Sequence, residues 1–169
     1  LSSRRMIDIR AEHTRIQDIR IDASAAADQI KYAMFSRNGD HLVLDNVDVL
    51  GANSQFDFAN QKNLTISNSA FSGEDMFFGG DSRQVFINNS EFTSFGGTSI
   101  LRGFGIQEFS ITNSSARNAA GETVTGRFFV DQPFGQETQN IYMGHNKTAQ
   151  MGPSEPNMNT GEIILFEPK

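Results

Sequence analysis

Leu64-Thr-Ile-Ser-Asn68, Val85-Phe-Ile-Asn-Asn89 and Phe109-Ser-Ile-Thr-Asn113 repeat one phrase along a chain of 169 residues. An earlier copy is Leu42-Val-Leu-Asp-Asn46, so the template reads apolar, any, apolar, any, Asn. Its central apolar positions lie 22, 21 and 24 residues apart, at Leu44, Ile66, Ile87 and Ile111. Weaker copies are expected on either side, at Ile19-Arg-Ile21 and Ile141-Tyr-Met143. A fixed period of this length indicates a repeat architecture.

Each copy is accompanied by two further apolar patches. A second short alternation follows the Asn, as in Val47-Asp-Val49, and a third patch lies about nine residues before the central position, as in Phe56-Asp-Phe58. Three such short strands per repeat, joined by Gly, Asn, Ser and Asp, do not form hairpins, and the period of two excludes a helical solenoid. The sequence therefore predicts an all-β fold, a right-handed parallel β-helix solenoid with six to seven rungs of about 22 residues.

The recurring Asn supports this fold independently. Asn46, Asn68, Asn89 and Asn113 fall at one place in successive turns, where side-chain amides can bond one another and the turn backbone. Asn also tolerates the left-handed conformation that a sharp corner demands. We expect a structural Asn ladder that points inward.

The pattern resembles the parallel β-helix repeat of the pectin-lyase-like superfamily, whose members show an Asn ladder at a tight turn after the second strand. Leu64–Asn68 and Val85–Asn89 carry the resemblance most clearly, and it extends over roughly residues 6 to 167. It implies a polysaccharide context, but the superfamily includes lyases, hydrolases, epimerases, phage tailspikes and adhesin-like scaffolds, so the fold does not select an activity. The paired-aspartate and Gly-His-Gly signatures of its polygalacturonase-like members are absent, because Met143-Gly-His145 has a lone Gly-His.

The resemblance places a site on the outer face of the first strand and its flanking loops. If Phe56 and Phe58 point inward, Asp57 points outward, and the same alternation, with Phe128 and Val130 inward, places Arg102 beside Arg127 on neighbouring rungs. Arginines can neutralise a uronate carboxylate while a carboxylate acts as base. The candidate catalytic residues are Asp57, Asp75, Arg102, Arg127 and Asp131, and the candidate substrate-binding residues are Glu74 and Asp81. The alternative is a solvated charged face that keeps the sheet soluble.

Composition excludes several other classes. A formal net charge of −6 and no cysteine argue against a nucleic-acid partner, a disulfide scaffold and a thiolate metal site. No apolar run approaches the length of a membrane span. The three histidines show no ligand spacing, so we expect no cofactor and no metal; calcium stays open without a motif to mark it.

Two functions remain. The first is a carbohydrate-active β-helix that binds a polysaccharide on the outer face of its first strand, and cleaves it if the chain is a polysaccharide lyase or glycoside hydrolase. The alternative is a non-catalytic β-helix scaffold of an adhesin, phage tail or cell-surface protein. We expect one domain over residues 1–169, part of a longer chain, that is extracellular or at the cell surface. Neighbouring residues or a second subunit are expected to cover the open rung at Met6–Ile9.

Overall fold

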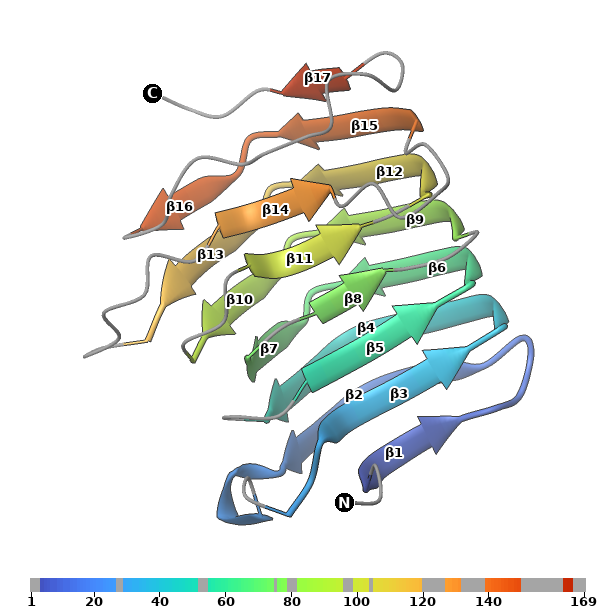
Figure 1. Ribbon diagram of the computed structural model, residues 1–169, viewed down its shortest axis with the longest axis vertical. Helices are drawn as coiled ribbons and strands as arrows, with labels where there is room; N and C mark the ends of the chain where they lie inside the picture. Colours follow the sequence, from blue (N-terminus) through green and yellow to red (C-terminus); the bar gives the residue numbers. More distant parts are fainter. Residues whose placement is uncertain are drawn as a thin grey trace.

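The computed structural model describes residues 4–26, 29–51, 55–74, 76–78, 82–95, 99–103, 105–119, 127–131, 139–149 and 163–165. Its strands stack as a parallel β-helix (Figure 1), which confirms the predicted fold class. Along the described chain, the first sheet stacks six strands in the order β1 (Arg5–Ile9), β3 (Tyr32–Arg37), β5 (Gln55–Ala59), β8 (Met76–Phe78), β11 (Ser99–Gly103) and β14 (Arg127–Asp131). All of its strand pairs are parallel.

The second sheet contains the other two strands of each repeat. It comprises, within the described ranges, β2 (Arg15–Asp22), β4 (Asp40–Leu50), β6 (Lys62–Ser67), β7 (Ala70–Gly73), β9 (Arg83–Asn88), β10 (Glu91–Ser94), β12 (Gln107–Thr112), β13 (Ser115–Asn118), β15 (Gln139–Gly144), β16 (Lys147–Ala149) and β17 (Ile163–Leu165). One half of this sheet stacks β4, β6, β9, β12, β15 and β17. The other half stacks β4, β7, β10, β13 and β16. β2 pairs with β4 along both halves. A short 3-10 turn, η1 (Ser24–Ala26), lies in the Ala-rich stretch between β2 and β3.

The template sets the register of the second sheet. Leu44 pairs with Ile66, Ile66 with Ile87, Ile87 with Ile111 and Ile111 with Met143, so the copy at Ile141–Met143 is confirmed. The copy at Ile19–Ile21 is wrong, because Ile16 is the partner of Leu44 and Ile19 pairs with Val47. Ile19 therefore belongs to the second alternation of its rung.

The core is a column of apolar side chains between the two sheets. Leu44, Phe58, Ile66 and Ile111 are fully buried, and Phe71 stacks on Phe92 with ring centroids 5.9 Å apart. Each such side chain contributes about 1.5–3 kcal/mol relative to an exposed one. One layer of these residues per rung stabilises the stack.

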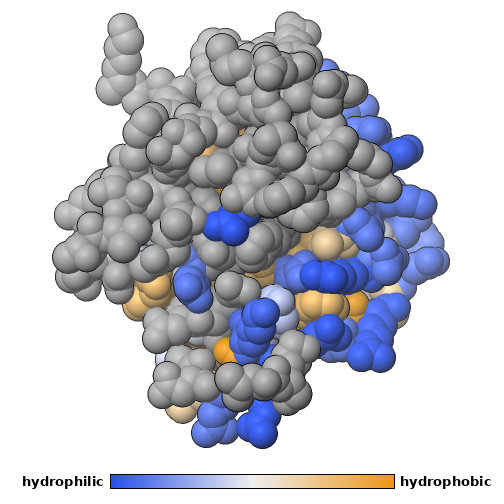
Figure 2. Space-filling view, in the orientation of Figure 1, coloured by the Kyte–Doolittle hydropathy of each residue, from blue (hydrophilic) through white to orange (hydrophobic). Residues whose placement is uncertain are grey.

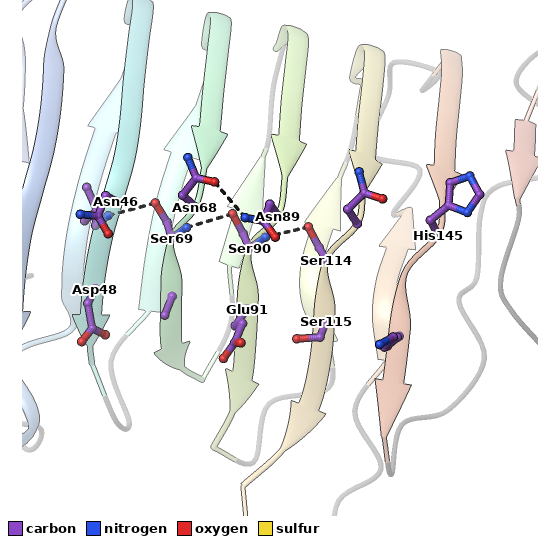
Figure 3. A pocket seen from close by; sticks show the side chains of 14 residues that line it. Asn46, Asp48, Asn68, Ser69, Asn89, Ser90, Glu91, Ser114, Ser115 and His145 are labelled. Atoms are coloured by element: carbon purple, nitrogen blue, oxygen red, sulfur yellow. Dashed lines mark hydrogen bonds between the residues drawn. The ribbon is translucent and has the colours of Figure 1, made fainter.

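The strands of the second sheet bend at a row of residues in the left-handed conformation. This corner row contains Asp18, Asn46, Asn68, Asn89, Asn113 and His145, with φ between 49° and 57°. Asn occupies four of these corners, which confirms that the repeat uses the tolerance of Asn for the left-handed backbone conformation. The expected inward direction is wrong: the four Asn side chains are exposed, and Figure 3 shows those of Asn46, Asn68 and Asn89 on the outer side of the coil.

The inward ladder is built instead by the residue after each corner. Ser69 Oγ accepts from the N–H of Val47 at 3.1 Å, Ser90 Oγ from the N–H of Ser69 at 3.3 Å, and Ser114 Oγ from the N–H of Ser90 at 3.1 Å. Each hydroxyl also donates to the carbonyl two residues before it in its own rung. These three buried residues, here called the serine ladder, satisfy backbone amides at the bend, which would otherwise be costly to bury.

Candidate functional site

A groove of about 560 Å³ runs along the outer side of the corner row (Figure 3). It forms because the left-handed residue turns the two halves of each strand toward one another on their outer side. Its lining comes from the rungs that carry Asn46, Asn68, Asn89, Asn113 and His145. The groove therefore follows the axis of the solenoid and crosses the strands.

The wall opposite the corner row is a second row of outward side chains. Strand register aligns this facing row along the axis as Asp48, Ala70, Glu91, Ser115 and Lys147. Between the two rows lie Val47 and the serine ladder. The lining is thus polar on nearly every rung, with small side chains at Ala70 and Ser115.

Charge in the facing row changes along the axis. Asp48 and Glu91 are carboxylates, and Lys147 is a cation at the far end. Arg20 lies 3.4 Å from Asp48 in an exposed ion pair, which is screened by water and salt. An anionic polymer in this groove would meet two carboxylates before it reached Lys147.

The corner amides are oriented by hydrogen bonds to the preceding rung. Nδ2 of Asn89 donates to Oδ1 of Asn68 at 2.9 Å, while Nδ2 of Asn68 donates to Oδ1 of Asp45 at 2.9 Å and Nδ2 of Asn113 to Oδ1 of Asn88 at 2.9 Å. The amide of Asn68 and the hydroxyl of Ser67 hold the pKa of Asp45 below its usual value of 3.8. These bonds fix the amide planes, so the corner row presents ordered polar groups to a ligand.

The predicted site on the first sheet contains an ion pair whose carboxylate is buried and whose guanidinium is half exposed. Asp57 has the outward position predicted for it, yet it is only 4% exposed. Nη2 of Arg37 donates to Oδ2 of Asp57 at 2.5 Å, which raises the pKa of the guanidinium, and Oδ1 of Asp57 has no hydrogen-bond partner among the described residues. Phe35 pairs with Asp57 in the register of the sheet and is 7% exposed, and the Arg5 guanidinium lies 3.4 Å from its ring centroid. This part of the face is occupied by the protein's own side chains.

The predicted arginine pair is not adjacent. Arg102 pairs with Phe77 on one side and Val130 on the other, whereas Arg127 pairs with Ser99 and Asp131 with Gly103. We expected Phe128 and Val130 to point inward from β14. The alternation is shifted by one residue, because Phe129 is buried and pairs with Leu101. A one-residue shift exchanges the two faces of a strand.

Three predicted residues remain. Glu74 follows β7 and is half-buried, while Asp75 and Asp81 lie outside the described residues. The catalytic and substrate-binding roles assigned to these residues stay predictions.

Sequence reasoning missed the facing row and two exposed aromatic residues. Phe86 and Tyr142 occupy the second, variable position of the template, whose other members are Val43, Thr65 and Ser110. The signal was available, since an aromatic residue between two inward residues of a strand must point outward.

Comparison of the chain with protein-family models, curated proteins and solved structures gave no match. Among the residues with described positions, no group of three or more His, Asp or Glu side chains is arranged to hold a metal ion. No helix in the same part of the chain is long and apolar enough to cross a membrane. The proposals below rest on the geometry of the groove and its surroundings.

Proposed function

We propose that this protein binds a polysaccharide chain along the groove at the corner of its second sheet. The observation that carries the proposal is a polar groove parallel to the solenoid axis, whose lining repeats once per rung. Neighbouring rungs are about 4.8 Å apart, which is comparable with the length of one sugar residue. An extended polymer rich in hydroxyl groups matches both the direction and the polarity of this lining.

The lining favours a neutral chain over a polyuronate. Sugar hydroxyls both donate and accept, and they can bond to the carboxylates of Asp48 and Glu91 and to the corner amides. A polyuronate would place its own carboxylates against Glu91 and would be repelled there, while Arg20 offsets part of the charge of Asp48. The arginine-based recognition of uronates predicted on the first sheet has lost its adjacent pair, Arg102 and Arg127.

Binding, and not cleavage, is the activity that the observations support. The sequence lacks the catalytic signatures of the family it resembles, and Asp57 is engaged with Arg37. This ion pair also favours the second candidate function, a non-catalytic scaffold in an adhesin, phage tail or cell-surface protein. The two functions differ in whether the groove binds glycan.

Affinity electrophoresis in gels containing soluble neutral or acidic polysaccharides tests the proposal. We expect retardation by a neutral polysaccharide and loss of it in Ala70→Trp, which fills the groove between Asp48 and Glu91. Arg83→Trp, on an exposed position of β9 outside the groove lining, is the matched control and should migrate as the parent does. Equal retardation of Ala70→Trp and Arg83→Trp would contradict binding of the polysaccharide in the groove. Absence of retardation in every gel would favour the scaffold.

A further inference from the structure

We propose that Phe86 and Tyr142 form a stacking platform beside the groove that selects β-1,4-linked polysaccharides with two-fold screw symmetry, such as soluble cellulose or chitin chains. The inference rests on the proposed function and adds a binding surface and a linkage class to it. It is argued from register, exposure, spacing and the packing of Tyr142.

The two aromatic residues face the same way on one line parallel to the axis. Phe86 pairs with Ser110, and Ser110 pairs with Tyr142, so the rings lie two rungs apart on the outer face of β9, β12 and β15. Phe86 is 45% exposed and Tyr142 37% exposed. The large exposed apolar side chains among the described residues are these two, Met6 and Ile19, so both exposed aromatic rings fall in one row.

Tyr142 lies down against the sheet. A Cβ placed on Gly144, two residues further along the strand, would come within 2.6 Å of the Tyr142 hydroxyl oxygen and 2.8 Å of its Cζ. The ring therefore occupies the space that a side chain at residue 144 would need. Gly144 immediately precedes His145, which lines the groove, so the platform is continuous with the groove wall.

The spacing of the rings fits a particular polymer geometry. Two rungs correspond to about 9–10 Å. A chain with two-fold screw symmetry presents the same ring face at every second sugar, with a repeat close to this distance. Phe86 and Tyr142 would then stack on alternate sugars, and the small Ser110 side chain leaves room for the sugar between them. Aromatic faces suit such contacts because they offer a flat apolar surface, to which Tyr adds a hydroxyl.

The surroundings of Phe86 argue for a glycan over an apolar protein surface. The neighbours of Phe86 in its own row are Thr65 and Ser110, and the next outward row contains Ser67, Asn88 and Thr112. Protein docking surfaces are contiguous apolar patches of a few hundred Å². An aromatic ring among hydroxyls and amides matches the alternation of apolar faces and hydroxyl rims on a sugar chain, and the register places Ile164 beside Tyr142 at the end of the row.

The test compares binding of cellohexaose, chitohexaose and the α-linked maltohexaose by isothermal titration calorimetry. We expect the wild-type chain to bind the β-1,4-linked ligands and to discriminate against maltohexaose. Phe86→Ala and Tyr142→Ala should each weaken binding by about tenfold, as expected for the loss of one aromatic contact. Thr65→Ala, in the same row, should retain wild-type affinity. Because the chain has two Tyr and no Trp, the Tyr142 signal can also be followed by fluorescence, with Tyr142→Phe as the blank.

The outcomes separate the two proposals. Loss of binding in both alanine variants, with thermal unfolding unchanged, supports the platform. If glycan binding persists unchanged in Phe86→Ala and Tyr142→Ala but is lost in Ala70→Trp, the platform is overturned and the groove stands. Equal binding of maltohexaose and cellohexaose overturns the linkage preference, and binding of none of the glycans overturns both proposals.

Discussion

The backbone N–H of Ser114 donates to Oδ1 of Asn146 at 3.0 Å, from one rung to the next. The Nδ2 of Asn146 returns a hydrogen bond to the carbonyl of Ile111 at 3.0 Å, and its side chain is 2% exposed. One amide thus performs the acceptor role that Ser69, Ser90 and Ser114 perform with hydroxyls. Asn146 therefore occupies the next place in the serine ladder after Ser114.

Replacing this residue should destabilise the fold. Asn146→Ala leaves the Ser114 N–H and the Ile111 carbonyl without side-chain partners, and each buried unsatisfied group costs about 1–3 kcal/mol. We expect a lower midpoint of urea unfolding. Asn146→Ser should recover part of the loss because its hydroxyl can accept from Ser114. Equal midpoints for Asn146→Ala and wild type would contradict the structural role of this amide.

The corner row predicts that Ala destabilises the fold at a position where Gly does not. Asn89 has φ 49°, a conformation that costs other L-residues about 1–2 kcal/mol. Asn89→Ala should reduce the free energy of unfolding by about 1 kcal/mol, while Asn89→Gly should be close to neutral. Asn88→Ala, at the neighbouring strand residue with ordinary φ, is the control for loss of an exposed amide. Denaturant titrations of the three variants measure the difference, and a smaller loss for Ala than for Gly would be inconsistent with the corner geometry.

Acid should destabilise the solenoid through its outer carboxylates. Hydrogen bonds from Asn68 and Ser67 hold the pKa of Asp45 below 3.8, and those from Ser24 do the same for Asp22. A pKa that is lower in the folded state stabilises the fold above the unfolded pKa, and this contribution is lost as pH falls through the folded pKa. We expect unfolding midpoints that are steady near pH 6 and decline below about pH 4. Asp45→Asn should make that decline shallower; an identical pH profile would show that Asp45 is not linked to folding.

The pair of Arg37 and Asp57 should behave as a structural contact. Arg37→Met removes the donor and leaves the carboxylate of Asp57 buried, at a cost of about 1–3 kcal/mol given that Arg37 is half exposed. The double variant Arg37→Met with Asp57→Leu should regain much of the lost stability, because an apolar pair needs no counter-charge. Thermal unfolding of the single and double variants completes the cycle. Additive losses would mean that the two side chains do not interact.

Gly144 offers an independent test of how Tyr142 lies. Gly144→Ala places a methyl group against the Tyr142 ring, which must lift from the sheet. Because the ring is at the surface and can move, we expect little change in thermal stability and a clear loss of affinity for β-1,4-linked oligosaccharides. Unchanged affinity with a folded variant would mean that the flat orientation of Tyr142 has no part in binding.

The fold followed from the sequence because its determinants are local and repeated. Leu44, Ile66, Ile87 and Ile111 recur with one period, and Asn46, Asn68, Asn89 and Asn113 mark one corner, so each rung confirms its neighbours. Asn was expected inside because its side chain can form hydrogen bonds. Its role at the corner depends on the backbone, and a small Ser is the residue whose hydroxyl fits the bend.

The site was harder to predict because it depends on the other face of the same strands. Asp57 was correctly placed outward, but its burial under Arg37 depends on a contact between residues 20 positions apart. Arg102 and Arg127 are not adjacent because Arg102 pairs with Val130, three residues after Arg127, in a strand where Phe128, Phe129 and Val130 are all apolar and alternation is ambiguous. No sequence motif links Asp48, Glu91 and Lys147. Only the strand register places them in one row along the axis.

The bend at each corner has a consequence for how such a molecule can be enlarged. One left-handed residue per rung turns the strand, and one serine beneath it satisfies the amide of the rung before. Neither device depends on how many rungs exist, because each rung contacts its neighbours alone. Duplicating a single coil would therefore lengthen the groove by about 4.8 Å without rebuilding its walls. The length of a linear ligand that the groove can contact therefore changes in steps of one turn, and duplication of the gene segment for one turn would provide each step.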